Sequence, residues 1–268
     1  MTTSFMHQEA IQKRLIEEGR KQFAAPPVFH KFTGVPEADE MMNDIKSYPH
    51  AFVLACIMDR QVKFERAWII PYKLLRRHGD FSMRALSELS LTDIRRLMTK
   101  PESLHRFIDI MSRNIHSAIE RISTTYRGDA SKIWIGEPSS AEVVYRFLEF
   151  EGVGPKIATM AANLLVRVFK IPLSEYSSID VSADVHVRRV LGRLGLCEAD
   201  ANVEQVIYKA RALNPGFPGI IDSPLFEIGR NYCRPTSQAC DQCAMIDICP
   251  SSKSRGNKKL SKARAKNE

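Results

Sequence analysis

One short stretch decides the fold: residues 150–158, FEGVGPKIA, join two helical segments by a very short turn. Ser139 and Glu142 upstream have the spacing of a capping box, and they open a segment with helical apolar periodicity. Pro155 suits the first position of a second helix, which continues to about Phe169. The glycines permit positive φ angles and close backbone approach. The pattern predicts a helical hairpin.

The turn of this hairpin is a candidate anion site. Amide N–H groups at a helix N-terminus lack partners, and the helix dipole favours a phosphate there, so we expect Gly152, Val153 and Gly154 to bind one. The alternative is an ordinary helical hairpin. Lys156 lies in the first turn, where the dipole disfavours a cation by roughly 0.3–1 kcal/mol. That position favours the neutral amine of a nucleophile, although an exposed lysine that bears a small penalty is the alternative.

A carboxylate follows downstream. Residues 183–194, ADVHVRRVLGRL, have helical apolar spacing that places Asp184 at the N-cap. A plain helix cap is the alternative to a catalytic role.

Four of the six cysteines lie close together, with the spacing C-x6-C-x2-C-x5-C from Cys233 to Cys249. Clustered cysteines in a reducing compartment indicate a metal, and both zinc and an iron–sulfur cluster take four thiolates. Cys56 and Cys197 stand alone in apolar contexts and are expected to be small core residues.

These motifs resemble, in the same order, those of the endonuclease III family of helix–hairpin–helix (HhH-GPD) DNA glycosylases. Residues 150–158 resemble the family's hairpin, residues 184–190 its Asp-x-His segment, and the cysteine spacing its [4Fe-4S] loop. The resemblance implies that Lys156 is the nucleophile and Asp184 the essential carboxylate. It implies a [4Fe-4S] cofactor, held by Cys233, Cys240, Cys243 and Cys249.

The resemblance also implies base-excision repair: removal of a damaged or mismatched base flipped from double-stranded DNA, with abasic-site lyase activity. Lys156 would add to C1′ of the sugar and form a Schiff base that permits β-elimination, while Asp184 would stabilise oxocarbenium charge. The expected DNA contacts are Gly152, Val153, Gly154, Arg60, Gln61, His186, Arg230 and Arg234.

The sequence departs from the family in two places. The spacing of 28 residues from Lys156 to Asp184 is longer than we associate with endonuclease III, and the extra segment contains a rival carboxylate, Asp180. Residues 54–61 resemble an early helix whose end supplies the residue that fills the gap left by the flipped base. Met58 stands in the place of the usual glutamine, and Gln61 is nearby.

The rest of the chain reads as all-α, and the resemblance implies the two-lobed fold of the helix–hairpin–helix DNA glycosylases. Helices are expected over 5–23, 37–47, 50–58, 60–78, 83–88, 91–98 and 101–125, with Asp80, Ser82 and Thr92 as candidate N-caps; the only tempting strand is 132–135. We expect a six-helix lobe with the hairpin over 35–171 and a cluster lobe from 1–34 and 172–250. Residues 251–268 hold seven lysines and arginines against one glutamate, which predicts a disordered basic tail.

Composition excludes other classes. No stretch approaches the roughly 18 apolar residues of a membrane helix, and no secretory signal is recognisable, so a soluble intracellular protein is expected. With the family resemblance, we expect a cytoplasmic, nucleoid-associated monomer. Two other functions use part of the pattern: a non-catalytic iron–sulfur helix–hairpin–helix DNA-binding protein, and a zinc-stabilised helical interaction module. Lys156 and Asp184 discriminate, because a pure binding protein needs neither.

Overall fold

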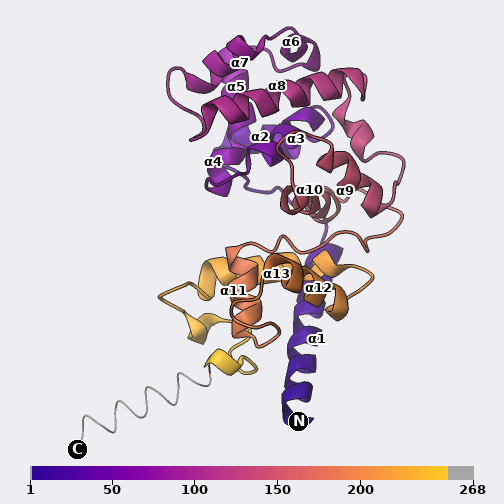
Figure 1. The fold of residues 1–268 in the computed structure, drawn as a ribbon, viewed down its shortest axis with the longest axis vertical. Coiled ribbons are helices and arrows are strands. Elements are labelled where there is room, and N and C mark those ends of the chain that lie inside the picture. The colour runs from indigo at the N-terminus through magenta and orange to yellow at the C-terminus, as the bar shows by residue number, and fades with distance from the viewer. Residues whose placement is uncertain (1, 253–268) are drawn as a thin grey trace, which may run out of the picture. The chain divides into compact units, whose positions relative to one another are not determined.

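The computed structural model describes residues 2–252, with side chains from His7 onward. Within these residues the chain is helical, and its one β-type pairing is an isolated bridge between Cys233 and Gln238. The all-α prediction is therefore confirmed. The chain divides into two compact units: unit 2, Pro26–Glu175, and unit 1, which combines Met1–Ala25 with the residues from Tyr176 onward (Figure 1).

The lobe boundaries expected from the sequence stay a prediction. The structure begins unit 2 at Pro26, before position 35, because the connecting segment packs inside it. Phe32 is fully buried and stacks on Trp68, with ring centroids 4.6 Å apart.

Unit 2 is built around α3 (Pro49–Met58), all of whose residues are buried, as expected of a helix that is apolar on every side. Phe52 of α3 packs edge-on to Trp68 and Trp134, with centroids 5.8 Å apart in each pair. Around α3 lie α2 (Pro36–Asn43), α4 (Phe64–Trp68), α5 (Ile70–His78), α6 (Met83–Ser87), α7 (Leu91–Thr99), α8 (Ile108–Thr124), the 3-10 helix η1 (Ala130–Ile133), α9 (Ser140–Leu148) and α10 (Pro155–Arg167).

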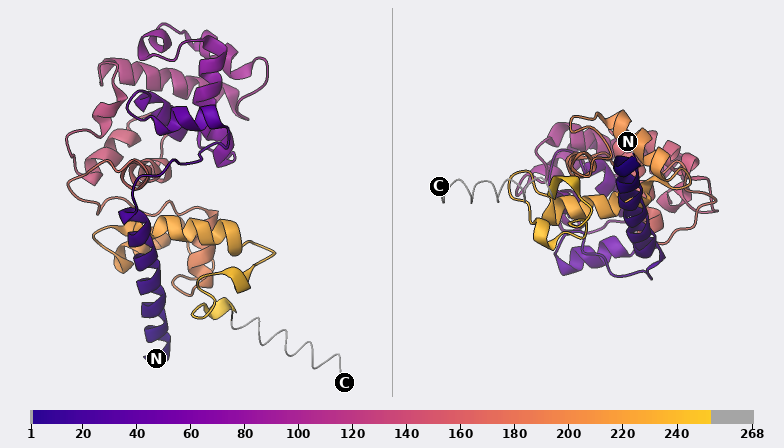
Figure 2. Two further views of the ribbon diagram at one scale, coloured as in Figure 1. Left: turned by 180° about the vertical axis from the view of Figure 1, so that it is seen from behind. Right: turned by 90° about the horizontal axis from the view of Figure 1, so that it is seen from below.

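Unit 1 brings the N-terminal helix together with the C-terminal segments (Figure 2). A Cβ at Gly19 of α1 (Thr2–Ala24) would lie 2.1 Å from the carbonyl oxygen of Ile220, so only glycine permits this contact. The other elements are α11 (Val185–Arg193), α12 (Val203–Leu213), the 3-10 helix η2 (Pro218–Ile221), α13 (Asp222–Glu227), the π-helical turn η3 (Ile228–Tyr232) and the 3-10 turn η4 (Cys240–Gln242).

Two expected helices are wrong at their N-terminal ends. Residues 59–63 form a turn, with Gln61 at a φ of 54°, and α4 begins only at Phe64. Residues 100–107 form a loop, and α8 begins only at Ile108. In both places the apolar periodicity extends to residues before the first helical residue. Periodicity alone therefore does not locate the start of a helix.

Among the smaller local predictions, some are confirmed and others are wrong. Of Asp80 and Ser82, Ser82 is the N-cap of α6, and Asp80 accepts the amide of Ser82 instead. The N-cap of α7 is Ser90 rather than Thr92, because Ser90 and Asp93 form a full capping box. The tempting strand over 132–135 is wrong, since its first two residues lie in η1 and its last two follow that helix outside any strand. The predicted basic tail comprises residues 251–268. Only residues 251 and 252 belong to the described part of the chain, and the rest of the tail lies outside it. No helix in the described part has the length and hydropathy that crossing a membrane requires.

Candidate functional site

The turn of the hairpin requires glycine at its first position. Gly152 has a φ of 81°, and a Cβ there would lie 2.1 Å from Nδ2 of Asn114 in α8. Gly154 differs, because its φ is −105° and an added Cβ would meet nothing within 4 Å. The helices on either side, α9 and α10, pack directly against each other. The first glycine is therefore structural, and the second leaves open space over the helix start.

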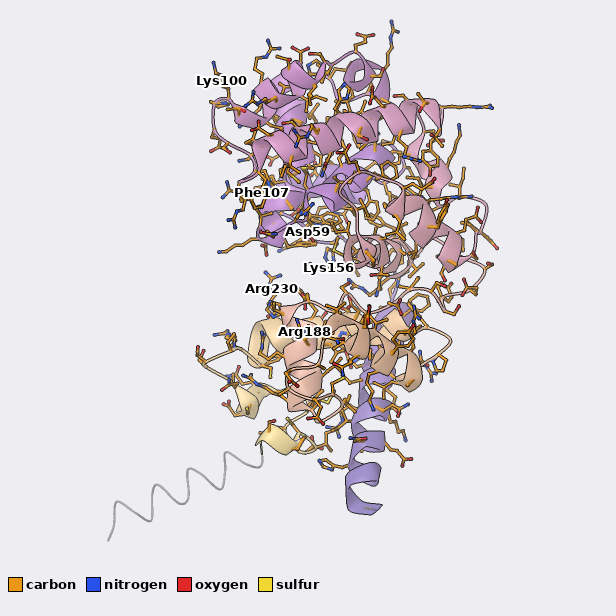
Figure 3. All side chains as sticks on the ribbon, viewed as in Figure 1. Asp59, Lys100, Phe107, Lys156, Arg188 and Arg230 are labelled. Carbon is orange, nitrogen blue, oxygen red and sulfur yellow. The ribbon has the colours of Figure 1, made fainter. Side chains whose placement is uncertain are left out.

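The start of α10 carries an exposed amine. Gly154 is the N-cap, Pro155 is the first helical residue, and no side chain caps the turn. Pro155 has no N–H, and the amide of Ile157 donates to the carbonyl oxygen of Gly154 at 3.0 Å, which leaves the amide of Lys156 without a partner within the helix. Lys156 is exposed in it. Figure 3 shows Lys156 toward the same end of unit 2 as Asp59.

Asp184 caps α11 in unit 1, as the sequence predicted. Its Oδ1 accepts the amides of His186 and Val187, both at 2.8 Å. These two bonds fix the orientation of the half-buried carboxylate. Among the described residues, nothing donates a hydrogen bond to Oδ2. Oδ2 of Asp184 therefore remains available to contact another group.

Asp180, the rival carboxylate, is committed to a structural pair. It is buried, and both of its oxygens accept from the guanidinium of Arg211 at 2.8 Å. A bidentate pair of this kind leaves little capacity for a reaction. The geometry favours Asp184 over Asp180.

The start of α11 is braced by the π-helical turn η3. His186 Nδ1 lies 3.0 Å from the guanidinium of Arg189, which also donates to the carbonyl oxygens of Gly229 and Cys233. A Cβ at Gly229 would lie 2.7 Å from Cβ of His186. This close approach requires glycine and holds the imidazole against the turn.

The predicted arginine contacts of unit 1 are exposed. Arg230 stands over the ring of Phe226, with its guanidinium carbon 5.9 Å from the ring centroid, and Arg234 is also exposed. Sequence reasoning missed Arg188, whose guanidinium is held by the carbonyl oxygen of Ala201 at 2.9–3.1 Å. Figure 3 labels Arg188 and Arg230 at one end of unit 1. Nothing in the sequence distinguished Arg188 from the other arginines of its helix.

The four cysteines of the C-terminal motif line one pocket of unit 1, whose walls also include Val190, Leu194, Ile228 and Met245. In the described part of the chain, no three Cys, His, Asp or Glu side chains are grouped so that they could hold a metal ion. Burial is the main cause that raises the pKa of the Cys243 and Cys249 thiols. Outside the pocket, Cys56 is fully buried as expected, whereas Cys197 is only half-buried.

Arg193 anchors the first cysteine of the motif. Its guanidinium lies 3.3 Å from Sγ of Cys233 and donates to the carbonyl oxygens of Arg234 and Pro235 at 2.7 and 3.0 Å. A cationic N–H group at this distance can donate a hydrogen bond to a sulfur that ligates a metal.

The turn after α3 carries the two predicted contacts of unit 2. Arg60 and Gln61 are exposed, whereas Met58 is fully buried. Met58 therefore belongs to the core, and of the two residues considered Gln61 is the one at the surface. The non-glycine φ of 54° at Gln61 marks a strained turn.

A second loop beside this turn was missed, because its residues were expected to be helical. Arg106 is exposed, and its guanidinium carbon lies 4.7 Å from the ring centroid of Phe107, which is labelled in Figure 3. In the sequence this contact is visible only as an arginine followed by a phenylalanine. Such a pair is common and does not by itself predict a cation stacked on an aromatic ring.

The fold resembles that of solved DNA glycosylases. The chain is similar to a thermostable thymine-DNA glycosylase, with a TM-score of 0.63 and 13% identity over 92% of this chain and 99% of that one. It is also similar to endonuclease III in a trapped covalent complex with DNA, with a TM-score of 0.55 and 19% identity over 84% of this chain and 99% of that one. The fold is thus the helical fold of the helix–hairpin–helix DNA glycosylases.

Sequence comparison finds similarity to endonuclease III proteins. The chain is 29% identical over 158 residues to endonuclease III of Thermotoga maritima, a segment that covers 59% of this chain and 67% of that one. No family model matches the chain. The endonuclease III-like resemblance inferred from the motifs is confirmed.

Proposed function

We propose that this protein is a base-excision-repair DNA glycosylase with associated abasic-site lyase activity. The observation that carries the proposal is Lys156, an exposed amine in the uncapped first turn of α10, directly after a turn that needs glycine. A structural hairpin has no use for a cation at this position, where the dipole opposes it. The similarity to endonuclease III supports the same assignment.

The chemistry assigned to Lys156 proceeds in balanced steps. The neutral amine attacks C1′ of the flipped nucleotide; a C1′–N bond forms, and the glycosidic bond breaks as the base leaves with the electron pair and takes up a proton. Opening of the sugar ring gives a Schiff base. Loss of a C2′ proton then breaks the C3′–O bond and expels the 3′ phosphate, and water finally releases the lysine.

Asp184 is proposed as the carboxylate of the first step. With Oδ1 fixed by two amides, the charge is held in place by the start of α11. A fixed negative charge stabilises the oxocarbenium character that develops as the glycosidic bond breaks. The arginines Arg60, Arg106, Arg188, Arg230 and Arg234 are proposed to bind phosphates of double-stranded DNA.

We propose a structural [4Fe-4S] cluster as the cofactor. The donor set fits, because four thiols line one mainly apolar pocket and Arg193 stands beside the first. A single zinc ion needs its ligands about 2.3 Å from one point. The C-x6-C-x2-C-x5-C spacing, which resembles the cluster loop of the endonuclease III family, supports a cluster, which takes one cysteine per iron. When bound, the cluster ties the C-terminal loop to α11.

The cofactor assignment is tested by analysis of the purified protein. We expect about four irons and four sulfides per chain and a brown colour, with loss of iron in Cys243→Ser. Cys197→Ser is the matched control, because this cysteine lies outside the pocket, and it should keep its iron. Stoichiometric zinc in place of iron contradicts the proposal.

The activity is tested by borohydride trapping on a duplex with one abasic site. A covalent protein–DNA complex is expected, and strand cleavage should accompany it without borohydride. DNA binding with neither trapping nor cleavage would favour the non-catalytic DNA-binding protein instead. A panel of duplexes, each with one damaged or mismatched base, then identifies the excised base.

A further inference from the structure

His105 lies beneath the turn of residues 59–63 and has one unused donor. The side chain is fully buried, in the loop that precedes α8. Its Nδ1 accepts the amide of Phe107 at 3.1 Å, which places the imidazole proton on Nε2. Burial lowers the pKa of this histidine, so the ring is neutral at pH 7. Nε2–H is therefore a buried donor whose partner has to come from the surroundings.

The neighbours of Nε2 are main-chain carbonyls of the turn. The carbonyl groups of Met58 and Arg60 are close enough to the imidazole for weak hydrogen bonds, which oppose the lowering of its pKa by burial. Yet Nε2 makes no hydrogen bond of normal distance and angle in this structure. A buried donor without a partner costs free energy, and a donor beside two acceptors needs only a small shift of the turn to find one.

The backbone of the turn of residues 59–63 is strained. Arg60 donates its amide to the carbonyl oxygen of Met58 only two residues back, at 2.7 Å, and Gln61 follows with its φ of 54°. A side chain in the left-handed region is strained, and such strain persists only where surrounding contacts impose it. The strained residue and the unused donor thus occur at the same place.

The loop that holds His105 is fixed by several contacts of its own. Lys73 pairs with Glu102 at 2.5 Å, and Arg77 donates to the carbonyl oxygen of Glu102 at 3.0 Å. Ser103 Oγ donates to the carbonyl oxygen of His105 at 2.8 Å. These contacts hold the loop beside the turn.

We propose that His105 is a positioning residue for the turn of residues 59–63, and that its Nε2–H donates to a carbonyl of this turn when Gln61 and Arg60 engage DNA at a missing base. The hydrogen bond would fix the turn in its DNA-bound form and recover the unused donor. This inference rests on the proposed function. His105 itself stays buried and touches no DNA.

Two substitutions separate the two nitrogens of the ring. His105→Asn places an oxygen where Nδ1 accepts from Phe107 but removes the donor toward the turn. His105→Gln reaches as far as Nε2 and keeps a donor toward the turn. If His105 positions the turn, glutamine rescues and asparagine does not; if it only holds its own loop, the order reverses.

The measurement is binding to a duplex with a tetrahydrofuran abasic-site analogue opposite 2-aminopurine. We expect His105→Asn to bind this duplex about five- to tenfold more weakly, as for loss of one hydrogen bond. The fluorescence change of 2-aminopurine should shrink, with no change in affinity for an intact duplex. His105→Gln should restore both.

His50 provides the matched control for burial. It is also a buried histidine of unit 2, with Nε2 2.7 Å from the carbonyl oxygen of Phe81. His50→Asn should lower the melting temperature and leave the preference for the abasic duplex unchanged. An equal loss of that preference in the two asparagine variants means that general destabilisation is the cause, and it overturns the proposal.

A measurement on the unaltered chain covers the case in which His105→Asn does not fold. A long-range 1H–15N spectrum should show the Nε2–H of His105 moving to a hydrogen-bonded shift when the abasic duplex is added. An unmoved signal on bound DNA overturns this inference alone. Failure of the unaltered protein to prefer the abasic duplex overturns the proposed function with it.

Discussion

The starts of α10 and α11 are two solutions to the same problem, the unpaired amides of a helix N-terminus. At α11, Asp184 accepts two of these amides and its negative charge agrees with the dipole. At α10, no side chain caps the turn, and Lys156 brings a positive charge to the positive end. The first residue is explained by stability alone, and the second is not. The comparison teaches that a functional residue is easiest to find where it opposes local stability.

The largest expected effect is that of Lys156→Ala. Borohydride trapping and strand cleavage should fall by on the order of 10³-fold or more, because the nucleophile is removed. Stability should stay equal or rise by about 0.5 kcal/mol, since an unfavourable charge leaves the helix start. Gel trapping and thermal unfolding measure the two. Trapping that survives the substitution unchanged refutes the role given to this lysine.

Asp184→Asn separates capping from catalysis. Asparagine caps as well as aspartate, so thermal stability should change little, while base excision should fall by about 10²–10⁴-fold. Binding to an abasic duplex should persist. Single-turnover excision on the preferred lesion gives the rate.

Asp180→Asn is the matched control. It breaks the pair with Arg211, and unfolding should become easier by about 2 kcal/mol, since one partner is half exposed. Excision per folded molecule should be retained. If this variant instead loses the chemistry and Asp184→Asn keeps it, the carboxylate role moves to Asp180.

The next effect compares the two glycines of the hairpin turn. Gly152→Ala should cost about 2 kcal/mol or more in unfolding free energy, because the φ of 81° is strained for alanine and its Cβ would meet Asn114. Gly154→Ala should cost less than about 1 kcal/mol, because no atom approaches it. Denaturant melts of the two variants decide. Equal losses would show that the turn does not discriminate between its glycines.

The smallest effect concerns the first helix of the hairpin. Ser139 caps α9 by accepting the amide of Glu142 at 3.1 Å, so Ser139→Ala should cost about 1 kcal/mol. Trapping at a temperature well below the melt should stay unchanged. A loss of trapping without a loss of stability would mean that α9 has a part in the chemistry that its cap does not explain.

Several features were predictable because they depend on residues close in sequence. The hairpin, the N-cap role of Asp184 and the cysteine motif follow from spacing, glycine and proline chemistry and helical periodicity. The all-α class follows from the same periodicity. Each of these has its cause within a few residues of itself.

Only the tertiary structure decided between candidates that look alike in one dimension. Asp180 and Asp184 differ because Arg211 comes from α12 to pair with the first. Met58 and Gln61 differ because the core closes around the last residue of α3 and the chain then turns outward. The place of His105 beneath that turn comes from two loops that the sequence read as helices. Burial and pairing depend on residues distant in the chain, and periodicity carries no information about them.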